Sequence, residues 1–147
     1  MPLISINPAT SEEIKIYPEY SLEEIDNILS KTINAQKKWS LLELDFRLEC
    51  ISHISGILKD RKREYASIMA YEMGKPIAQA KAEVDKCAWL CDYYRQYAPE
   101  FLSDKLIETE YYKSMVTIQP IGLILGIMPW NFPFWQVFRF ATPVLIT

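Results

Sequence analysis

The chain contains 147 residues, of which 50% are hydrophobic, 24% charged and 13% aromatic. This length and composition fit one folded domain with a sizeable core and exclude intrinsic disorder, collagen and a coiled coil as descriptions of the whole chain. The formal net charge of −3 gives no sign of a nucleic-acid-binding surface, and the start of the chain lacks the apolar run of a secretory signal.

The amino-terminal part of the chain predicts two short strands followed by a helix. Leu3 to Ile6 and Glu13 to Tyr17 have strand character, and Asn7 to Thr10 forms a turn between them. Ser21 with Glu24 three residues later is the signature of a capping box, which starts a helix. The apolar residues that follow at helical spacing are Ile25, Ile28, Leu29 and Ile33, with Trp39 near the end of the helix.

Helical periodicity continues over the middle of the chain. Ser40 and Glu43 repeat the capping signal before a second helix. A third helix ends at Gly74, and Pro76 begins a fourth helix that runs to about Tyr97. These elements predict an antiparallel layer of helices.

The last part of the chain changes character. Residues 104–113 form a polar connection, and Met115 to Gln119 and Gly122 to Met128 predict strands. Pro129 to Pro133 predicts a rigid turn, and Phe134 to Leu145 a helix. The predicted fold class is therefore α/β, with a helical layer followed by the first strand–turn–helix unit of a sheet.

Charge is nearly absent from residues 114–147, where Arg139 is the only charged side chain. Either this stretch enters a bilayer, or it is buried by polypeptide that is not in this chain. Three prolines between residues 120 and 133 break a helix and disfavour the membrane span. The uninterrupted apolar run 121–128 fits one strand buried on both faces in a parallel sheet, but such a strand has no partner within this chain.

The cysteines and the single histidine give no catalytic pattern. Cys87 and Cys91 lie four residues apart on one helix face, but a metal site needs a further ligand, and His53 is the only histidine. We expect buried or half-buried thiols, because free cysteine is usually buried. Three cysteines without a CxxC pair predict reduced thiols and a cytoplasmic protein.

The segment from Pro120 to Pro133 favours a functional interpretation. A Trp-Asn-Phe turn between two prolines follows a buried strand, where open α/β sheets place their ligands. The amide N–H₂ of Asn131, held there by restricted backbone, suits an oxyanion that develops on an attacked carbonyl. Such a donor contributes about 3–4 kcal/mol in comparable sites.

At these residues the sequence resembles the NAD(P)-dependent aldehyde dehydrogenase superfamily. The match is the strand followed by Pro-Trp-Asn-Phe-Pro at 129–133, and the string 128–139 is similar to the succinate-semialdehyde dehydrogenase branch. Supporting matches are Asn7 to Thr10, Trp39 before the helix with Arg47, and Glu72 to Pro76. The resemblance implies that residues 1–113 form the helical part of a cofactor-binding domain. Residues 114–147 would then form an oligomerisation-type strand, the first Rossmann strand, the turn and the start of the next helix.

The resemblance also implies a role for individual residues. Asn131 matches the asparagine of the oxyanion hole, and Arg139 matches an arginine that binds the distal carboxylate of the substrate. Phe132 and Gln136 match positions of the substrate tunnel. The residues that match the nicotinamide–ribose part of the cofactor site are Ile127, Met128, Pro129 and Trp130.

The assignment of Arg139 has independent support from spacing and charge. Phe132, Gln136 and Arg139 share one face if the helix begins at the turn. A buried arginine needs a carboxylate partner, which a dicarboxylate half-aldehyde supplies in a bidentate contact. The alternatives are an ion pair within the protein and simple exposure.

The resemblance places the nucleophilic cysteine, the glutamate base and the adenosine-ribose lysine downstream of residue 147. We therefore expect NAD or NADP and a small aldehyde, succinate semialdehyde, to be bound by a complete enzyme. The 147-residue chain alone is expected to be inactive and to hold no cofactor. Exposed apolar surface predicts a homo-oligomer or pairing with a complementary fragment, with neither nucleic acid nor membrane as partner. The alternative function is a non-catalytic interaction module.

Overall fold

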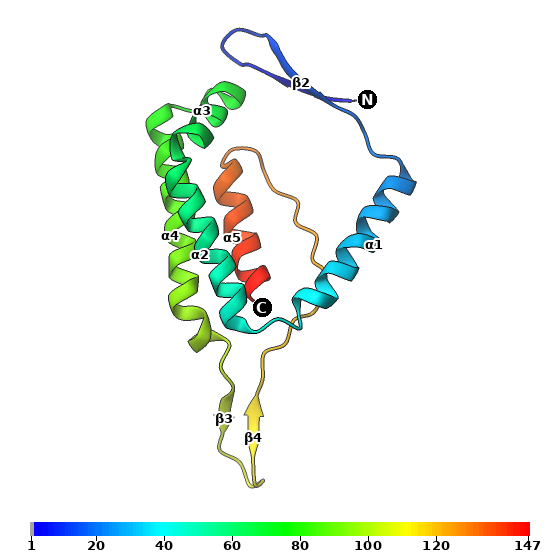
Figure 1. Cartoon of the computed structure of the whole chain (residues 1–147), viewed down its shortest axis with the longest axis vertical. Coiled ribbons are helices and arrows are strands. Elements are labelled where there is room, and N and C mark those ends of the chain that lie inside the picture. The colour runs from blue at the N-terminus through cyan, green and yellow to red at the C-terminus, as the bar shows by residue number, and fades with distance from the viewer. Residues whose placement is uncertain (1) are drawn as a thin grey trace.

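The computed structural model describes residues 2–147 and is built around a group of packed helices (Figure 1). Its elements in chain order are β1 (Leu3–Ile6), β2 (Glu13–Tyr17), α1 (Leu22–Trp39), α2 (Leu44–Asp60), α3 (Lys62–Met73), α4 (Ile77–Phe101), β3 (Lys105–Ile107), β4 (Ser114–Val116) and α5 (Pro133–Ile146).

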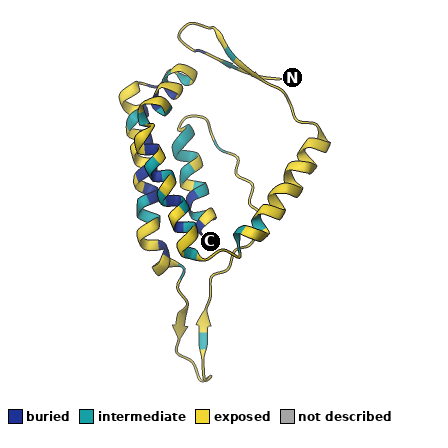
Figure 2. Ribbon diagram, viewed as in Figure 1, coloured by how far each residue is buried: buried dark blue, intermediate teal, exposed yellow. Residues whose placement is uncertain are grey.

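The hydrophobic core lies between α2, α3, α4 and α5, where Figure 2 shows the buried positions. Leu48, Ile51 and Leu58 form the inner face of α2 and belong to the same cluster as Val84 of α4. This helical layer confirms the prediction for the middle of the chain. The remaining core residues are Ala66, Met69, Ala80, Cys87, Ala88, Cys91, Ala98 and Ile146.

The two hairpins lie outside this core. Strands β1 and β2 pair antiparallel, with Leu3 opposite Tyr17, and both strands have their predicted bounds. The side chain of Asn7 accepts a hydrogen bond from the Ala9 N–H at 2.9 Å, which closes the predicted turn. Strands β3 and β4 pair with Leu106 opposite Met115. The prediction that 104–113 is only a polar connection missed β3, and the predicted strand 115–119 is shorter and begins at Ser114.

Helix α1 stands apart from the other helices (Figure 1) and has no buried residue. Its capping box forms as predicted: Glu24 N–H donates to Ser21 Oγ at 3.2 Å, and Ser21 N–H donates to the Glu24 carboxylate at 2.7 Å. The end of α1 is attached to α5, because the indole N–H of Trp39 donates to the Leu145 carbonyl at 2.7 Å. The apolar face of α1 thus contributes nothing to the core.

Two helix boundaries differ from the sequence-based expectation. The residue before α2 is Glu43, and no side chain caps this helix, so the second predicted capping box is wrong. Helix α3 ends at Gly74 as predicted, with φ at +69°. Helix α4 continues past Tyr97 to Phe101 with Pro99 in its last turn, so this proline removes one N–H donor without ending the helix.

The predicted strand 122–128 does not form. Residues 117–129 are extended but unpaired, and Leu125 and Ile127 are 85% and 87% exposed. The physical reason is that a parallel strand needs neighbouring strands, and residues 2–147 provide none for this segment. None of the helices in this described range has the length and hydrophobicity that a membrane span requires.

Candidate functional site

The turn after the extended segment leads directly into α5. Pro133 occupies the first helical position, where its missing N–H costs no hydrogen bond. Phe132, the residue before the helix, has φ −136° and ψ 73° and provides no side-chain cap. The predicted rigid turn and the helix after it are therefore present, and Asn131 lies exposed in the turn.

A carboxylate from α4 caps α5 instead. Glu83 Oε1 accepts hydrogen bonds from the backbone N–H groups of Phe134 and Trp135, each at 3.0 Å. First-turn N–H groups have no partner within their own helix, and the helix dipole favours a negative charge at this end. The cap therefore comes from a residue about fifty positions earlier in the chain.

Glu83 is also paired with a buried lysine. Its second carboxylate oxygen accepts a hydrogen bond from Lys75 Nζ, and the two side chains are only 3% and 6% exposed. Lys75 Nζ lies 4.0 Å from the ring centroid of Phe132, a cation–π contact. The left-handed Gly74 ends α3, and Lys75 follows it in the short connection to α4. The Lys75–Glu83 pair thus contacts the chain directly after Asn131, at Phe132 and in the first turn of α5.

These side chains surround a pocket of about 660 Å³. Of the predicted site residues, it brings together Asn131, Phe132, Gln136 and Arg139, for which the resemblance implied the oxyanion hole and the substrate site. Its other lining residues are Lys75, Gln79, Ala82, Glu83, Lys86 and Trp135. The shared helix face that spacing predicted for Gln136 and Arg139 is therefore present.

The residues predicted for the cofactor side do not line this pocket. Ile127, Pro129 and Trp130 are exposed, and Met128 is half-buried. Trp130 borders a different hollow, which it shares with Pro8. The structure thus separates the predicted residues into a group that lines the pocket and a second group along the exposed segment.

The pocket wall is predominantly positive. It contains three cationic side chains, Lys75, Lys86 and Arg139, and one carboxylate, Glu83, which is paired with Lys75. Lys86 Nζ lies 3.9 Å from the ring centroid of Trp135. Arg139 is exposed, which is the alternative of simple exposure and not the expected burial. Within residues 2–147 no carboxylate forms a salt bridge with it, so the alternative of an internal ion pair is not realised. This arrangement suits a ligand that carries an anionic group.

Sequence reasoning missed Lys75, Glu83 and Lys86. Lys75 lies within the Glu72-to-Pro76 string that supported the family resemblance, but the string alone gives it no partner. Glu83 follows Lys75 by eight residues, but Lys75 lies in the connection before α4, so no helical spacing relates the two side chains. The sequence therefore gave no signal for this pair.

The cysteines are not part of this pocket. Cys87 and Cys91 are buried in the core, and desolvation raises the pKa of Cys87 to about 12, with the nearby Glu83 carboxylate acting in the same direction. Desolvation also raises the pKa of Cys91, whose sulfur lies 3.9 Å from the Thr142 hydroxyl. Cys50 is half-buried on α2, and no group of three metal-ligating side chains occurs in residues 2–147. The expectation of buried thiols is confirmed for Cys87 and Cys91.

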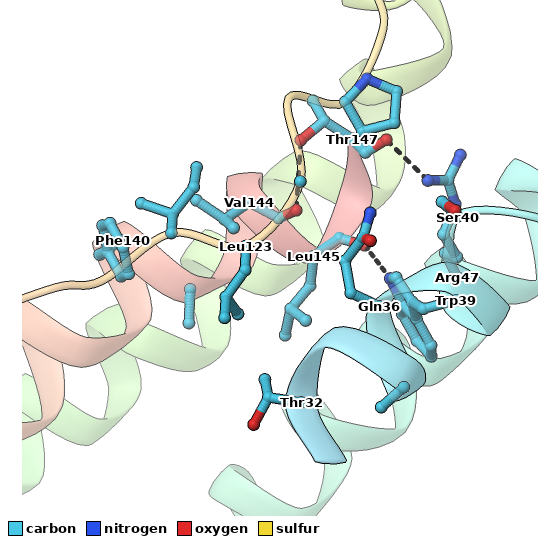
Figure 3. Close-up of a pocket in the computed structure, with 15 residues that line it drawn as sticks. Thr32, Gln36, Trp39, Ser40, Arg47, Leu123, Phe140, Val144, Leu145 and Thr147 are labelled. Atoms are coloured by element: carbon cyan, nitrogen blue, oxygen red, sulfur yellow. Dashed lines mark hydrogen bonds between the residues drawn. The ribbon is translucent and has the colours of Figure 1, made fainter. Parts of the chain in front are cut away.

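A second pocket, of about 410 Å³, lies between α1, α5 and the extended segment (Figure 3). Trp39, Leu123, Phe140 and Val144 give it a mainly apolar wall. Two hydrogen bonds close one end, from the Trp39 indole to Leu145 and from Arg47 Nη1 to the Thr147 carbonyl at 2.8 Å (Figure 3). It contains none of the predicted site residues.

Comparison with known proteins finds similar sequences over nearly the whole chain. Residues 2–147 match the model of the aldehyde dehydrogenase family. A Synechocystis protein named as a probable succinate-semialdehyde dehydrogenase (NADP+) is 40% identical over 146 residues, which are 99% of this chain and 32% of the relative. The succinate semialdehyde dehydrogenase (NAD(P)+) Sad of Escherichia coli is 41% identical over 143 residues, 97% of this chain and 31% of the relative.

A solved structure gives the same result for the fold. The succinic semialdehyde dehydrogenase of Streptococcus pyogenes, in complex with NADP+, superposes with a TM-score of 0.92 at 33% identity, covering 97% of this chain and 32% of that one. The α/β fold class predicted from the sequence is therefore confirmed. The chain spans about a third of the length of the relatives that it matches.

Proposed function

The chain belongs to the aldehyde dehydrogenase family, and on that premise we propose that it provides the oxyanion donor and part of the substrate site of an NAD(P)-dependent enzyme that oxidises succinate semialdehyde to succinate. The observation that carries the proposal is the pocket that joins Asn131, Phe132, Gln136 and Arg139. In this proposal residues 1–113 are the helical part of the cofactor-binding domain. Residues 114–147 contribute an oligomerisation-type strand and the turn that carries Asn131.

Asn131 is proposed to stabilise the negative oxygen that forms when a nucleophile attacks the aldehyde. Its side chain is exposed at the pocket, so its amide N–H₂ can reach a ligand without a change in the fold. An amide donor fixed beside the reacting carbonyl favours the transition state over the ground state and therefore acts on kcat.

Arg139 is proposed to bind the far carboxylate of the substrate. Its guanidinium lies at the same pocket as Asn131, and no protein carboxylate within the described residues neutralises it. A planar guanidinium binds a carboxylate in two parallel hydrogen bonds. Gln136 and Phe132 line the same pocket and are proposed to hold the short carbon chain of the substrate.

Ile127, Met128, Pro129 and Trp130 are proposed to contact the cofactor, NAD or NADP, which accepts a hydride when bound. Three of the four are exposed, so they are free to make such contacts. The names of the relatives in Synechocystis and E. coli include NADP+ and NAD(P)+, respectively, which favours a nicotinamide cofactor without selecting one.

The 147-residue chain alone is proposed to be inactive and to bind no cofactor. Cys50, Cys87 and Cys91 lie outside the pocket, and its one carboxylate, Glu83, is occupied by Lys75 and by α5. A nucleophile and a free base must then come from other polypeptide. We also propose a cytoplasmic location, and association with a second copy or a complementary fragment through the exposed apolar segment.

The second candidate function is a non-catalytic interaction module. Exposed Leu125 and Ile127 favour it, because an extended apolar segment without a partner strand can pair with another chain. Both candidate functions involve this segment. Measuring turnover in a complete enzyme that contains residues 1–147 distinguishes the two functions.

A fusion protein tests the proposed function. Residues 1–147 replace the aligned third of the E. coli relative, and NAD(P)H formation is measured with succinate semialdehyde. Turnover by the fusion, and none by the 147-residue chain alone, is the expected result. A fusion with native-like circular dichroism and cooperative unfolding but no turnover contradicts the enzymatic proposal and favours the interaction module.

Arg139→Met in the same fusion tests the substrate. We expect KM for succinate semialdehyde to rise by about tenfold or more, because a bidentate charge-assisted contact is lost. KM for butanal, which has the same chain length without the carboxylate, is expected to change little. Equal effects on both aldehydes contradict the assignment of Arg139.

A further inference from the structure

The buried Lys75–Glu83 pair links three elements at one point of the structure. Lys75 lies between α3 and α4, Glu83 lies two turns into α4, and both contact the chain around the start of α5. A buried ion pair by itself is weak evidence of stabilisation, because desolvation offsets much of the attraction. The position of the pair at the start of α5 therefore needs an explanation other than stabilisation.

Both charged groups of the pair are engaged with the turn that carries Asn131. On the carboxyl side of Asn131, Glu83 Oε1 accepts the Phe134 and Trp135 N–H groups at 3.0 Å. Next to Asn131, the Phe132 ring lies 4.0 Å from Lys75 Nζ. The turn has no other side-chain cap within the described residues, since Phe132 cannot provide one.

We propose that Glu83, held by Lys75, is a positioning residue: it fixes the first turn of α5 and thereby the direction in which Asn131 presents its amide. This inference rests on the proposed role of Asn131 as oxyanion donor. Glu83 touches neither substrate nor cofactor in this proposal, and it acts only through the backbone at Phe134 and Trp135.

The geometry gives a reason for using a residue from another helix. A cap from within the turn would place a polar side chain at Phe132, which lines the substrate pocket. With the cap supplied from α4, the turn keeps an aromatic wall and its backbone N–H groups are still satisfied. Because Glu83 is 3% exposed and sits on a packed helix, the point of attachment is rigid.

The test compares two double variants of the 147-residue chain that both lack the ion pair. Lys75→Met with Glu83→Gln keeps a carbonyl oxygen for the two N–H groups, and Lys75→Met with Glu83→Leu removes it at similar size. Hydrogen exchange of the Phe134 and Trp135 amides is followed by NMR, together with the heteronuclear NOE of Asn131.

We expect exchange at Phe134 and Trp135 to accelerate by about tenfold or more in the leucine variant, because their only acceptor is lost. The Asn131 NOE falls with it, and the glutamine variant retains both signals. Equal behaviour of the two variants, whether both lose or both keep these signals, overturns the proposal. If the leucine variant loses exchange protection throughout α2 and α4, the glutamine variant becomes the test. Protection of the Phe134 and Trp135 amides in the glutamine variant supports the cap, and loss of that protection overturns it.

A kinetic cycle in the fusion protein distinguishes positioning from stability. We expect the leucine variant to lower kcat at least about tenfold with KM nearly constant, and to have little further effect once Asn131→Ala is present. A leucine variant that still lowers kcat as much after Asn131→Ala contradicts action through Asn131. If the fusion has no activity at all, the proposed function fails, and the NMR comparison still decides whether Glu83 fixes the turn.

Discussion

The group of helices α2 to α5 and the segments outside it differ in where their apolar side chains go. In the helical group these side chains pack against one another and form one core that reaches Ile146 near the end of the chain. In α1 and the extended segment 117–129 they remain exposed. The turn with Asn131 lies where the two regions meet, and the side chain that caps the helix after it comes from the packed one. A site can thus be held in place by a completed core even though the segment leading into it has no partner.

The largest difference between the regions is expected from matched isoleucine substitutions. Ile51 is 2% exposed on α2, and Ile28 is 46% exposed on α1. We expect Ile51→Ala to lower the free energy of unfolding by about 2–4 kcal/mol, since it removes packed atoms and leaves a cavity. Ile28→Ala is expected to change it by about 0.5 kcal/mol or less. Urea unfolding monitored by circular dichroism measures both values.

Similar losses from both isoleucine variants would show that α1 packs as tightly as α2. In that case the contrast between the two regions does not hold for the molecule in solution.

Matched glycine substitutions test the junction that carries Lys75. Gly74 has φ +69°, and a Cβ at this position would lie 3.1 Å from Pro8 Cγ. Gly74→Ala is therefore expected to cost about 1–2 kcal/mol through backbone strain alone. Gly56 lies within α2 with open space around its Cα, so Gly56→Ala is expected to stabilise the protein by about 0.5–1 kcal/mol. Thermal unfolding gives the sign of each change in stability. A Gly74→Ala variant with unchanged stability contradicts the expected backbone strain at this position.

The smallest effect concerns the thiols of the packed region. Burial raises the pKa of Cys87 to about 12, whereas an unfolded cysteine has a pKa of about 8.5. Because the folded pKa is the higher one, the stability associated with this proton is fully present below about pH 8.5 and is lost as pH rises toward about 12. We expect Tm to decline from pH 8.5 to 10, and Cys87→Ala to reduce that decline.

Thiol labelling at pH 8 tests whether burial protects Cys87. Half-buried Cys50 is expected to react with a disulfide reagent about a hundredfold faster than Cys87. Equal rates would mean that the core opens readily and that burial does not protect Cys87.

The elements that the sequence predicted correctly depend on local chemistry. The capping box at Ser21 and Glu24 and the left-handed end of α3 at Gly74 involve residues a few positions apart. The run 121–128 has equally strong strand character, but its hydrogen bonds need neighbouring strands that residues 2–147 do not contain. Strand β3 was missed for a related reason, since its three residues gain strand character only by pairing with β4.

The residues of the candidate site also fall into a part that the sequence predicted and a part that it did not. The motif and the helical spacing placed Asn131, Phe132, Gln136 and Arg139 together, and they line one pocket. Glu83 and Lys86 reach that pocket through the packing of α4 against α5, about fifty positions apart in the chain, which no periodicity reveals. The grouping of these four side chains was therefore predictable, and the residues that support the turn were not.

Kinetics of Asn131→Ala in the fusion with the E. coli relative decide whether this amide acts as proposed. Asn131→Ala removes the only donor assigned to the oxyanion and leaves Arg139 and the aromatic wall intact. We expect kcat for succinate semialdehyde to fall by about 10²–10³-fold with KM nearly unchanged, since the amide acts on the transition state. A variant that retains the kcat of the parent fusion contradicts the proposed role of Asn131.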